Sequence, residues 1–419
     1  MSPSLKGWCL GQPTHSLAFF RQSLRLLCTP TFPAFLNRPG TSTSRTRRPP
    51  AVTKQEVPPS MTSASVSSPP RIPSEAGDAE TEDQAPRIEA DPELAAAAAA
   101  AAADDDDDGD SAIDSASIAS STASLSESVF DYRQLHGRTY QATKTTEYWA
   151  PNDDQQNEGL DIIHNALLML FDDKLFLAPI GDTPQRVLDV GTGTGIWAID
   201  FADQFPNAEV TGTDISPIQP GWVPANLRFV IDDFLLDWTY PENHFDFIHL
   251  RQLYGSVPNW VDLYKNAYHC LKPGGWIQNL EVNAGVDSDH VEYPPDHIFL
   301  EWNRIFDQGG RKTGRSFTVA QGHTMRDNME EAGFVDVVER KFKLPIHCWP
   351  KDESLQRAGL LIQLALEESL EGFGTFLLTQ VLGWSQPEVM VLTAQMRKEI
   401  RRKANYGYCE TTVVYGRKP

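Results

Sequence analysis

The feature that most constrains this chain is a glycine-rich loop between a short apolar strand and a helix. The segment reads Val187-Leu-Asp-Val-Gly-Thr-Gly-Thr-Gly-Ile196. Its glycines permit a tight turn and let a ligand approach the backbone closely at the carboxyl edge of a sheet. The motif is GxGxG, whereas the dinucleotide fingerprint GxGxxG would need its third glycine at Ile196. Asp189, just before the loop, would repel a pyrophosphate, so the loop favours a cationic ligand over a dinucleotide.

Strands and helices alternate around this loop. The sequence predicts strands over Arg186–Val190, Glu209–Thr213, Leu227–Ile231, Phe245–Leu250 and Trp276–Glu281. It predicts helices over Leu160–Phe171, Ile196–Gln204 and Trp260–Leu271. Two later strands, Phe334–Phe342 and Thr411–Tyr415, are separated by a mostly helical run from Ser354 to Lys403. Such alternation is typical of βαβ units, so we expect an α/β fold with a parallel sheet.

The net charge of -21 is unevenly distributed over the 419 residues. Residues 1–55 hold eight basic side chains and no acid, whereas residues 131–419 hold 26 basic and 40 acidic ones. An acidic folded part argues against direct nucleic-acid binding, and no apolar run approaches the roughly 20 residues of a membrane span. The five cysteines are scattered without CxxC spacing, which argues against a disulfide framework or a zinc site and suits a reducing compartment.

Composition divides the chain into three regions. We expect a basic disordered leader over 1–60, an acidic low-complexity disordered tail over 61–130, and a folded domain over 131–419. The tail contains Ala95–Ala103 and Asp104–Asp108 and has too few apolar residues to form a core. The leader has the composition of a mitochondrial transit peptide. A plain disordered tail, or a translated leader ahead of a true start at Met61, is the alternative.

Five motifs in order resemble those of the class I S-adenosylmethionine-dependent methyltransferases. They are the glycine loop, Val210-Thr-Gly-Thr-Asp214, Val230-Ile-Asp-Asp-Phe234, Phe245-Asp-Phe-Ile-His-Leu250 and Leu271-Lys-Pro-Gly-Gly-Trp276. The resemblance implies a Rossmann-like parallel sheet with an antiparallel last strand, and S-adenosylmethionine as the cofactor. The helical run before the last strand then becomes an insertion near the C-terminus.

The same resemblance implies roles for individual residues. The glycine loop would wrap the amino-acid portion of the cofactor, and Asp214 would accept hydrogen bonds from its ribose hydroxyls. Asp233 would accept from the adenine amine beside Phe234, with Asp232 as the alternative register. Arg251 is a candidate for the cofactor carboxylate, for an acidic substrate or for a surface salt bridge. The complete set predicted to bind the cofactor is Asp189, Val190, Gly191, Thr192, Gly193, Gly195, Asp214, Ile215, Asp232, Asp233, Phe234 and Arg251.

Three residues are candidates to contact the methyl acceptor. Tyr254 and Trp260 follow the fourth strand, where this fold commonly places its substrate, with plain core packing as the alternative. Glu281 ends the fifth strand and points to the same edge. His249 lies in an apolar strand, which favours a core histidine with satisfied hydrogen bonds, with a base as the alternative. No side chain is a convincing base, so the sequence assigns no catalytic residue and no metal ligand.

Segments outside the core motifs resemble the fungal LaeA-type group of methyltransferase-domain proteins. They are Tyr148-Trp-Ala-Pro-Asn-Asp153, Asp214-Ile-Ser-Pro-Ile-Gln-Pro220, Ile248-His-Leu-Arg251 and Val413-Val-Tyr-Gly-Arg-Lys-Pro419. The resemblance implies regulation of secondary metabolism, a nuclear or cytoplasmic location and velvet-type protein partners. The alternatives are a tailoring methyltransferase with the helical insertion as a lid, and a catalytically silent scaffold. The acceptor is a small molecule or a protein: a deep aromatic-lined cavity would favour the former, a shallow open groove the latter.

Overall fold

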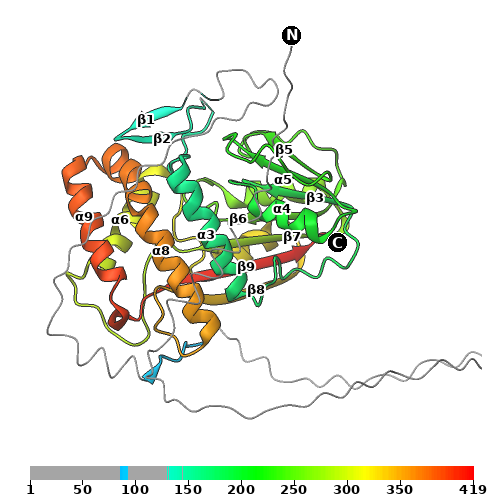
Figure 1. Ribbon diagram of the computed structural model, residues 1–419. Helices are drawn as coiled ribbons and strands as arrows, with labels where there is room; N and C mark the ends of the chain where they lie inside the picture. Colours follow the sequence, from blue (N-terminus) through cyan, green and yellow to red (C-terminus); the bar gives the residue numbers. More distant parts are fainter. Residues whose placement is uncertain (1–84, 93–129, 131, 144) are drawn as a thin grey trace, which may run out of the picture. The chain divides into compact units, whose positions relative to one another are not determined.

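The computed structural model describes residues 85–92, 130, 132–143 and 145–419 (Figure 1). The basic leader predicted over 1–60 and most of the acidic tail predicted over 61–130 lie outside these residues. Within the part that the structure describes, no helix is both long and apolar enough to cross a membrane.

A seven-stranded sheet forms the centre of the folded domain. Its order is β5-β4-β3-β6-β7-β9-β8. The strands are β3 (Arg186–Val190), β4 (Glu209–Asp214), β5 (Leu227–Ile231), β6 (Phe245–Arg251), β7 (Leu271–Val282), β8 (Val335–Pro345) and β9 (Tyr408–Arg417). Neighbours from β5 to β7 are parallel, whereas β9 runs antiparallel to both β7 and β8. The predicted α/β class, the parallel sheet and the antiparallel last strand are confirmed.

Helices cover both faces of the sheet because neighbouring strand residues point to opposite sides. Leu188 and Ile248 pack in a core with α5 (Trp260–Cys270) and α7 (Thr324–Glu331). Their neighbours Val187 and Phe247 pack in a second core with α4 (Ile196–Gln204). Apolar side chains on both faces explain why the strands read as nearly continuous hydrophobic runs in the sequence.

Further helices lie beside the sheet. They are α3 (Asp154–Leu170), α6 (Ile298–Thr313), α8 (Glu353–Phe376), a π-helical turn over Leu377–Leu382 and α9 (Gln386–Ile400). The predicted insertion is therefore present as α8 and α9. In Figure 1, α3 and α8 run side by side across the front of the domain. A Cβ at Gly159 of α3 would lie 2.3 Å from Ser369 Oγ of α8, so this glycine allows the two helices to touch.

A small hairpin precedes α3. Its strands are β1 (Arg133–Leu135) and β2 (Arg138–Tyr140), joined by His136 and Gly137 at φ 50° and 80°. Two consecutive positive φ angles are typical of a tight hairpin turn. Arg138 donates to Asp153 through Nε and Nη2 at 2.6 and 2.7 Å, and Asp153 also caps the N-terminus of α3. The ion pair therefore fixes the hairpin to the start of that helix.

Residues 85–92 differ from the prediction of a disordered tail. Ile88 is buried against Trp349 and Tyr408, and Ala90 forms a β-bridge with Pro350. The backbone N–H of Lys351 donates to the carbonyl of Glu89 at 2.8 Å. A second backbone hydrogen bond, from Asp91 N–H to the carbonyl of Trp349 at 3.0 Å, and side-chain contacts of Arg87 and His290 complete the docking of this short segment.

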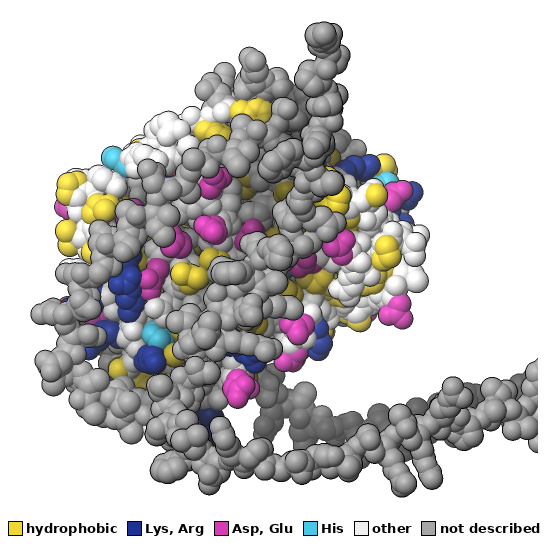
Figure 2. Space-filling view, viewed as in Figure 1, with side chains coloured by type: hydrophobic (Ala, Val, Ile, Leu, Met, Phe, Trp, Pro, Cys, Tyr) yellow, Lys and Arg dark blue, Asp and Glu magenta, His cyan; other side chains and the backbone are white. Residues whose placement is uncertain are grey.

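The described side chains on the face seen in Figure 2 are mixed in charge. Aspartates and glutamates are scattered among apolar and basic residues, and no extended basic patch is visible there. This distribution agrees with the acidic balance of residues 131–419.

Candidate active site

A cleft lies where β3, β4, β5 and β6 end at the carboxyl edge of the sheet; we call it the glycine-loop cleft. It encloses about 870 Å³ of empty space, its open mouth included. Nine of the twelve predicted cofactor residues line it: Asp189, Gly191, Thr192, Gly193, Asp214, Ile215, Asp233, Phe234 and Arg251. The structure thus brings together residues from four separate strand ends.

The remaining three predicted residues do not line the cleft. Val190 is buried in the core beside α5. Gly195 lies against the ring of Phe229: its φ is 82°, and a Cβ there would lie 2.3 Å from Cζ of Phe229. Asp232 donates its backbone N–H to the carbonyl of Asp214, while its neighbour Asp233 reaches the cleft. Asp232 and Asp233 were the two candidates for contact with the adenine, and the geometry favours Asp233.

Gly193 forms the open side of the loop. Its φ is 58°, and a Cβ there would meet only Leu160 Cδ1, at 3.9 Å. The backbone N–H of Gly193 donates to Oδ2 of Asp214 at 2.8 Å. The backbone is therefore bare toward the cleft, as close approach of a ligand requires.

Asp214 is the carboxylate with the clearest electrostatic signature in the cleft. Burial raises its pKa to about 6, against hydrogen bonds from the N–H groups of Ser216 and Gly193 that lower it. No cation pairs with it among the described residues, and the charge of Asp189 adds to the rise. A partly buried carboxylate of this kind gains from ligand hydroxyls that donate to its free lone pairs.

Asp189 is held from both sides. His249 Nδ1 lies 2.8 Å from its Oδ1, and Thr192 Oγ1 donates to its Oδ2 at 2.5 Å. Burial lowers the pKa of His249, whose ring stacks on Trp197 at 3.6 Å. His249 is thus a neutral core histidine, as the sequence indicated, and the structure adds that its Nδ1–H donates to Asp189.

Arg251 reaches the cleft as a partly buried cation. Its Nη1 lies 2.9 Å from Nδ1 of His164, whose Nε2 lies 2.9 Å from Asp200 Oδ2. Burial lowers the pKa of His164, so the neutral ring accepts from Arg251 and donates to Asp200. Within the described residues this is the one hydrogen bond of the Arg251 guanidinium, which leaves donors for a ligand carboxylate.

The segment before α3 closes the cleft, which the sequence did not predict. Thr145 and Thr146 donate from Oγ1 to Oδ2 of Asp233 at 2.8 and 2.6 Å. Thr146 and Tyr148 of this segment line the cleft, as does Leu160 of α3. Burial raises the pKa of Tyr148, so its phenol stays protonated. Tyr148 lies within the LaeA-type segment 148–153, which was the one available signal.

A second cavity, which we call the apolar chamber, adjoins the cleft. It is lined by Trp149, Ile163, Gln252, Tyr254, Val282, Asn283, Ala284, Trp302, Phe306, Leu344, Ile362, Leu366, Phe373 and Cys409. Gln252 lines both cavities, and its φ of 56° is rare for a residue other than glycine. Such backbone strain clusters at functional sites, which favours a role for Gln252 where the cavities meet.

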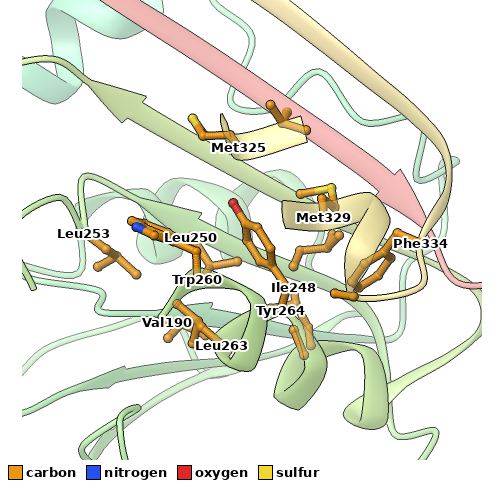
Figure 3. Close-up of a cluster of buried hydrophobic side chains, with 14 of the residues drawn as sticks. Val190, Ile248, Leu250, Leu253, Trp260, Leu263, Tyr264, Met325, Met329 and Phe334 are labelled. Carbon is orange, nitrogen blue, oxygen red and sulfur yellow. The ribbon is translucent and has the colours of Figure 1, made fainter. Parts of the chain in front are cut away.

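The three substrate candidates have different positions. Tyr254 lines the apolar chamber. Trp260 lines neither cavity: Figure 3 shows it among core side chains near Leu250, because it begins α5 rather than the preceding loop. Glu281 is fully buried and accepts the backbone N–H groups of Leu253 and Tyr254 at 3.0 and 2.9 Å. It positions the loop after β6 and contacts neither cavity.

Known proteins resemble this chain over the same region. A family model described as a methyltransferase domain matches residues 162–339. Methyltransferase pytC of Aspergillus terreus is 38% identical over 301 residues, 72% of this chain and 92% of pytC. The secondary metabolism regulator LAE1 of Cochliobolus heterostrophus is 34% identical over 68% of this chain and 94% of LAE1. The chain belongs to the LaeA-like methyltransferases.

A further relative widens the range of functions in the group. The protein-methionine methyltransferase laeA of Emericella nidulans is 31% identical over 69% of this chain and 77% of that protein. Membership in the group confirms the predictions of an enzyme that transfers methyl groups and of S-adenosylmethionine as its cofactor.

The cleft of this LaeA-like methyltransferase fits that cofactor. The bare backbone at Gly193 leaves room for a ligand against the loop. Asp214 offers a carboxylate without a paired cation, and Arg251 offers guanidinium donors. Hydroxyl, amino and carboxylate groups of one ligand would thus each meet a partner of suitable chemistry.

Proposed function

We propose that this LaeA-like methyltransferase methylates a small molecule held in the apolar chamber, with S-adenosylmethionine in the glycine-loop cleft. When bound, the cofactor supplies an electrophilic methyl group on a positively charged sulfur. Gly193 and its neighbours would wrap the amino-acid portion, and Arg251 would bind its carboxylate. Asp214 would bind the ribose hydroxyls, while Asp233 and Phe234 would hold the adenine.

The chain's own contribution is positioning and exclusion of water. Asp189, with both oxygens engaged by His249 and Thr192, provides fixed negative charge at the loop. Glu281 holds the backbone of Leu253 and Tyr254, which form the border between the two cavities. Preorganised walls of this kind accelerate transfer by bringing the reacting atoms together in a dry site.

The observation that supports this proposal most strongly is that the two cavities meet. Gln252 lines both, so a molecule in the chamber would lie beside the contents of the cleft. Ten of the fourteen chamber residues, Trp302 and Phe306 among them, are at most 9% exposed. A deep cavity with aromatic walls suits a small molecule, whereas a polypeptide would need an open groove.

The experiment follows isotope-labelled methyl groups from S-adenosylmethionine into an organic extract of a fungal culture. We expect label in small organic products. Leu366→Trp, which fills the chamber from α8, should abolish that label while the affinity for S-adenosylmethionine stays unchanged. Leu364→Trp is the matched control, because Leu364 lies on the same helix with 38% of its surface exposed. Label found only in protein would overturn the small-molecule acceptor.

A second candidate is methylation of a protein in a regulatory role. It is supported by LAE1 and laeA, whose names describe regulators or a protein-methionine methyltransferase. Velvet-type partners and a nuclear or cytoplasmic location belong to this candidate; a mitochondrial location belongs with the transit-peptide interpretation of residues 1–60. Label in a protein fraction, with loss of many metabolites on gene deletion, would favour it. A silent scaffold would show no cofactor binding.

A further inference from the structure

The wall of the apolar chamber is uncharged. None of its fourteen lining residues is Asp, Glu, Lys, Arg or His. A charged ligand placed there would lose its hydration without gaining a counterion, which is strongly unfavourable. The occupant expected for this wall is therefore neutral.

Aromatic rings form much of this wall. Trp149, Tyr254, Trp302, Phe306 and Phe373 contribute five of the fourteen lining residues. Aromatic side chains bind flat rings through stacked and edge-to-face contacts. The chamber encloses about 560 Å³ of empty space, a figure that includes the open space at its mouth.

One fully buried polar atom among the lining residues lacks a partner within the described part of the chain. Asn283 is 1% exposed, and its Oδ1 makes no hydrogen bond among the described residues. Its Nδ2 donates to Oε2 of Glu410 at 3.0 Å, and its backbone N–H donates to the Glu410 carbonyl at 2.9 Å. Because a carboxylate accepts but does not donate, Glu410 fixes the amide with Nδ2 toward it and Oδ1 away from it.

An unpaired buried acceptor is costly unless a ligand satisfies it. We propose that Asn283 Oδ1 accepts a hydrogen bond from a hydroxyl or N–H group of a neutral, ring-shaped acceptor molecule in the apolar chamber. This inference rests on the proposed function and names the class of its substrate. It makes Asn283 a specificity-determining residue, which Glu410 positions.

Equilibrium dialysis of two probes against the full-length protein tests the inference. The probes are 2-naphthol and 2-methylnaphthalene, which have nearly the same shape but differ in the hydroxyl donor. We expect 2-naphthol to bind wild-type protein at least as tightly, although an apolar cavity alone would favour the methyl compound. The Asn283→Leu variant should lose about tenfold in its preference for 2-naphthol.

Asn279→Leu is the matched control. Asn279 lies on β7, the strand that ends one residue before Asn283. It is fully buried and also has an unpartnered Oδ1 among the described residues, but it donates to Tyr264 and does not line the chamber. Its loss should leave the preference between the two probes unchanged. An equal change in both variants would overturn the inference, since it would reflect a general loosening of β7.

The wild-type protein alone also tests the inference if Asn283→Leu fails to fold. Tighter binding of 2-methylnaphthalene by tenfold or more, or no binding of either probe, would overturn it. S-adenosylhomocysteine is titrated into the same samples to separate the two proposals. If it binds while 2-methylnaphthalene binds tenfold or more tightly than 2-naphthol, the inference fails and the methyltransferase site stands; if it does not bind, the proposed function fails.

Discussion

Asp214 accepts the backbone N–H of Gly193 at 2.8 Å, so the carboxylate that ends β4 holds the glycine loop that follows β3. Its other oxygen accepts the N–H of Ser216 at 2.9 Å. Burial nevertheless raises its pKa to about 6. The loop is thus fixed by a group that is itself short of partners, which a ligand with hydroxyl donors can supply.

Binding of S-adenosylmethionine should weaken as pH falls through about 6, because Asp214 then takes up a proton. In the ligand-free protein, the effect of pH on the free energy of unfolding has the opposite sign. The pKa of Asp214 in the folded protein lies above its ordinary value of 3.8, so the stability contribution of this group is present below pH 3.8 and lost as pH rises through about 6. Asp214→Asn should remove both dependences. Calorimetric titrations and thermal melts between pH 4 and 8 would check this, and an unchanged pH profile in the variant would contradict it.

Glu281→Gln should flatten the pH dependence of stability over a higher range. Burial raises the pKa of Glu281 from 4.5 to about 8, so wild-type stability should decline as pH rises through this interval. The variant should show a lower melting temperature at pH 5, because its NH₂ group cannot accept one of the two backbone N–H groups. Glu301→Gln, on the exposed side of α6, is the control. Parallel melting curves for wild type and Glu281→Gln across the range would refute this role.

Gly195→Ala should destabilise the fold by about 2–4 kcal/mol, from positive φ together with overlap on the Phe229 ring. Gly181→Ala measures the part of this loss that comes from the backbone conformation alone, because Gly181 has φ 76° and a Cβ there would meet no atom within 4 Å. Urea denaturation of both variants measures the difference. Equal losses in the two proteins would show that the Phe229 contact contributes nothing.

Docking of residues 85–92 should depend on Ile88. Ile88→Ala removes the side chain that packs on Trp349 and Tyr408 and should cost about 2 kcal/mol. Hydrogen exchange at the Lys351 amide, which donates to Glu89, reports this directly. Glu89→Ala keeps that carbonyl and removes only an exposed ion pair with Lys351, so exchange there should change little. Fast exchange in wild type would contradict the docking.

Local patterns predicted much of the fold. Arg186–Val190, Leu227–Ile231 and Ile196–Gln204 have the same bounds in the structure as in the prediction. Such elements can be predicted because periodic apolar residues and a glycine loop are recognisable from a few consecutive residues. Helix α6 was missed, since Gly309 and Gly310 weaken its helical signal; a Cβ at Gly309 would lie 2.5 Å from Leu377, so tertiary packing explains the glycine.

The candidate site was predictable only where it follows strand ends. Asp214 and Asp233 reach the cleft because parallel strands bring their carboxyl ends to one edge. Thr146, by contrast, reaches Asp233 across 87 residues of sequence, and no local pattern marks such a contact. Trp260 was predicted to lie in the loop after the fourth strand. It is instead the first residue of α5, and its side chain packs in the core.

Calorimetric titration of S-adenosylmethionine into the full-length protein tests the assignment of the glycine-loop cleft most directly. We predict micromolar affinity for wild type and a loss of at least about tenfold in Asp214→Ala, since two charge-assisted hydrogen bonds disappear. Absence of binding by folded wild-type protein, or equal affinity in the folded variant, would contradict that assignment.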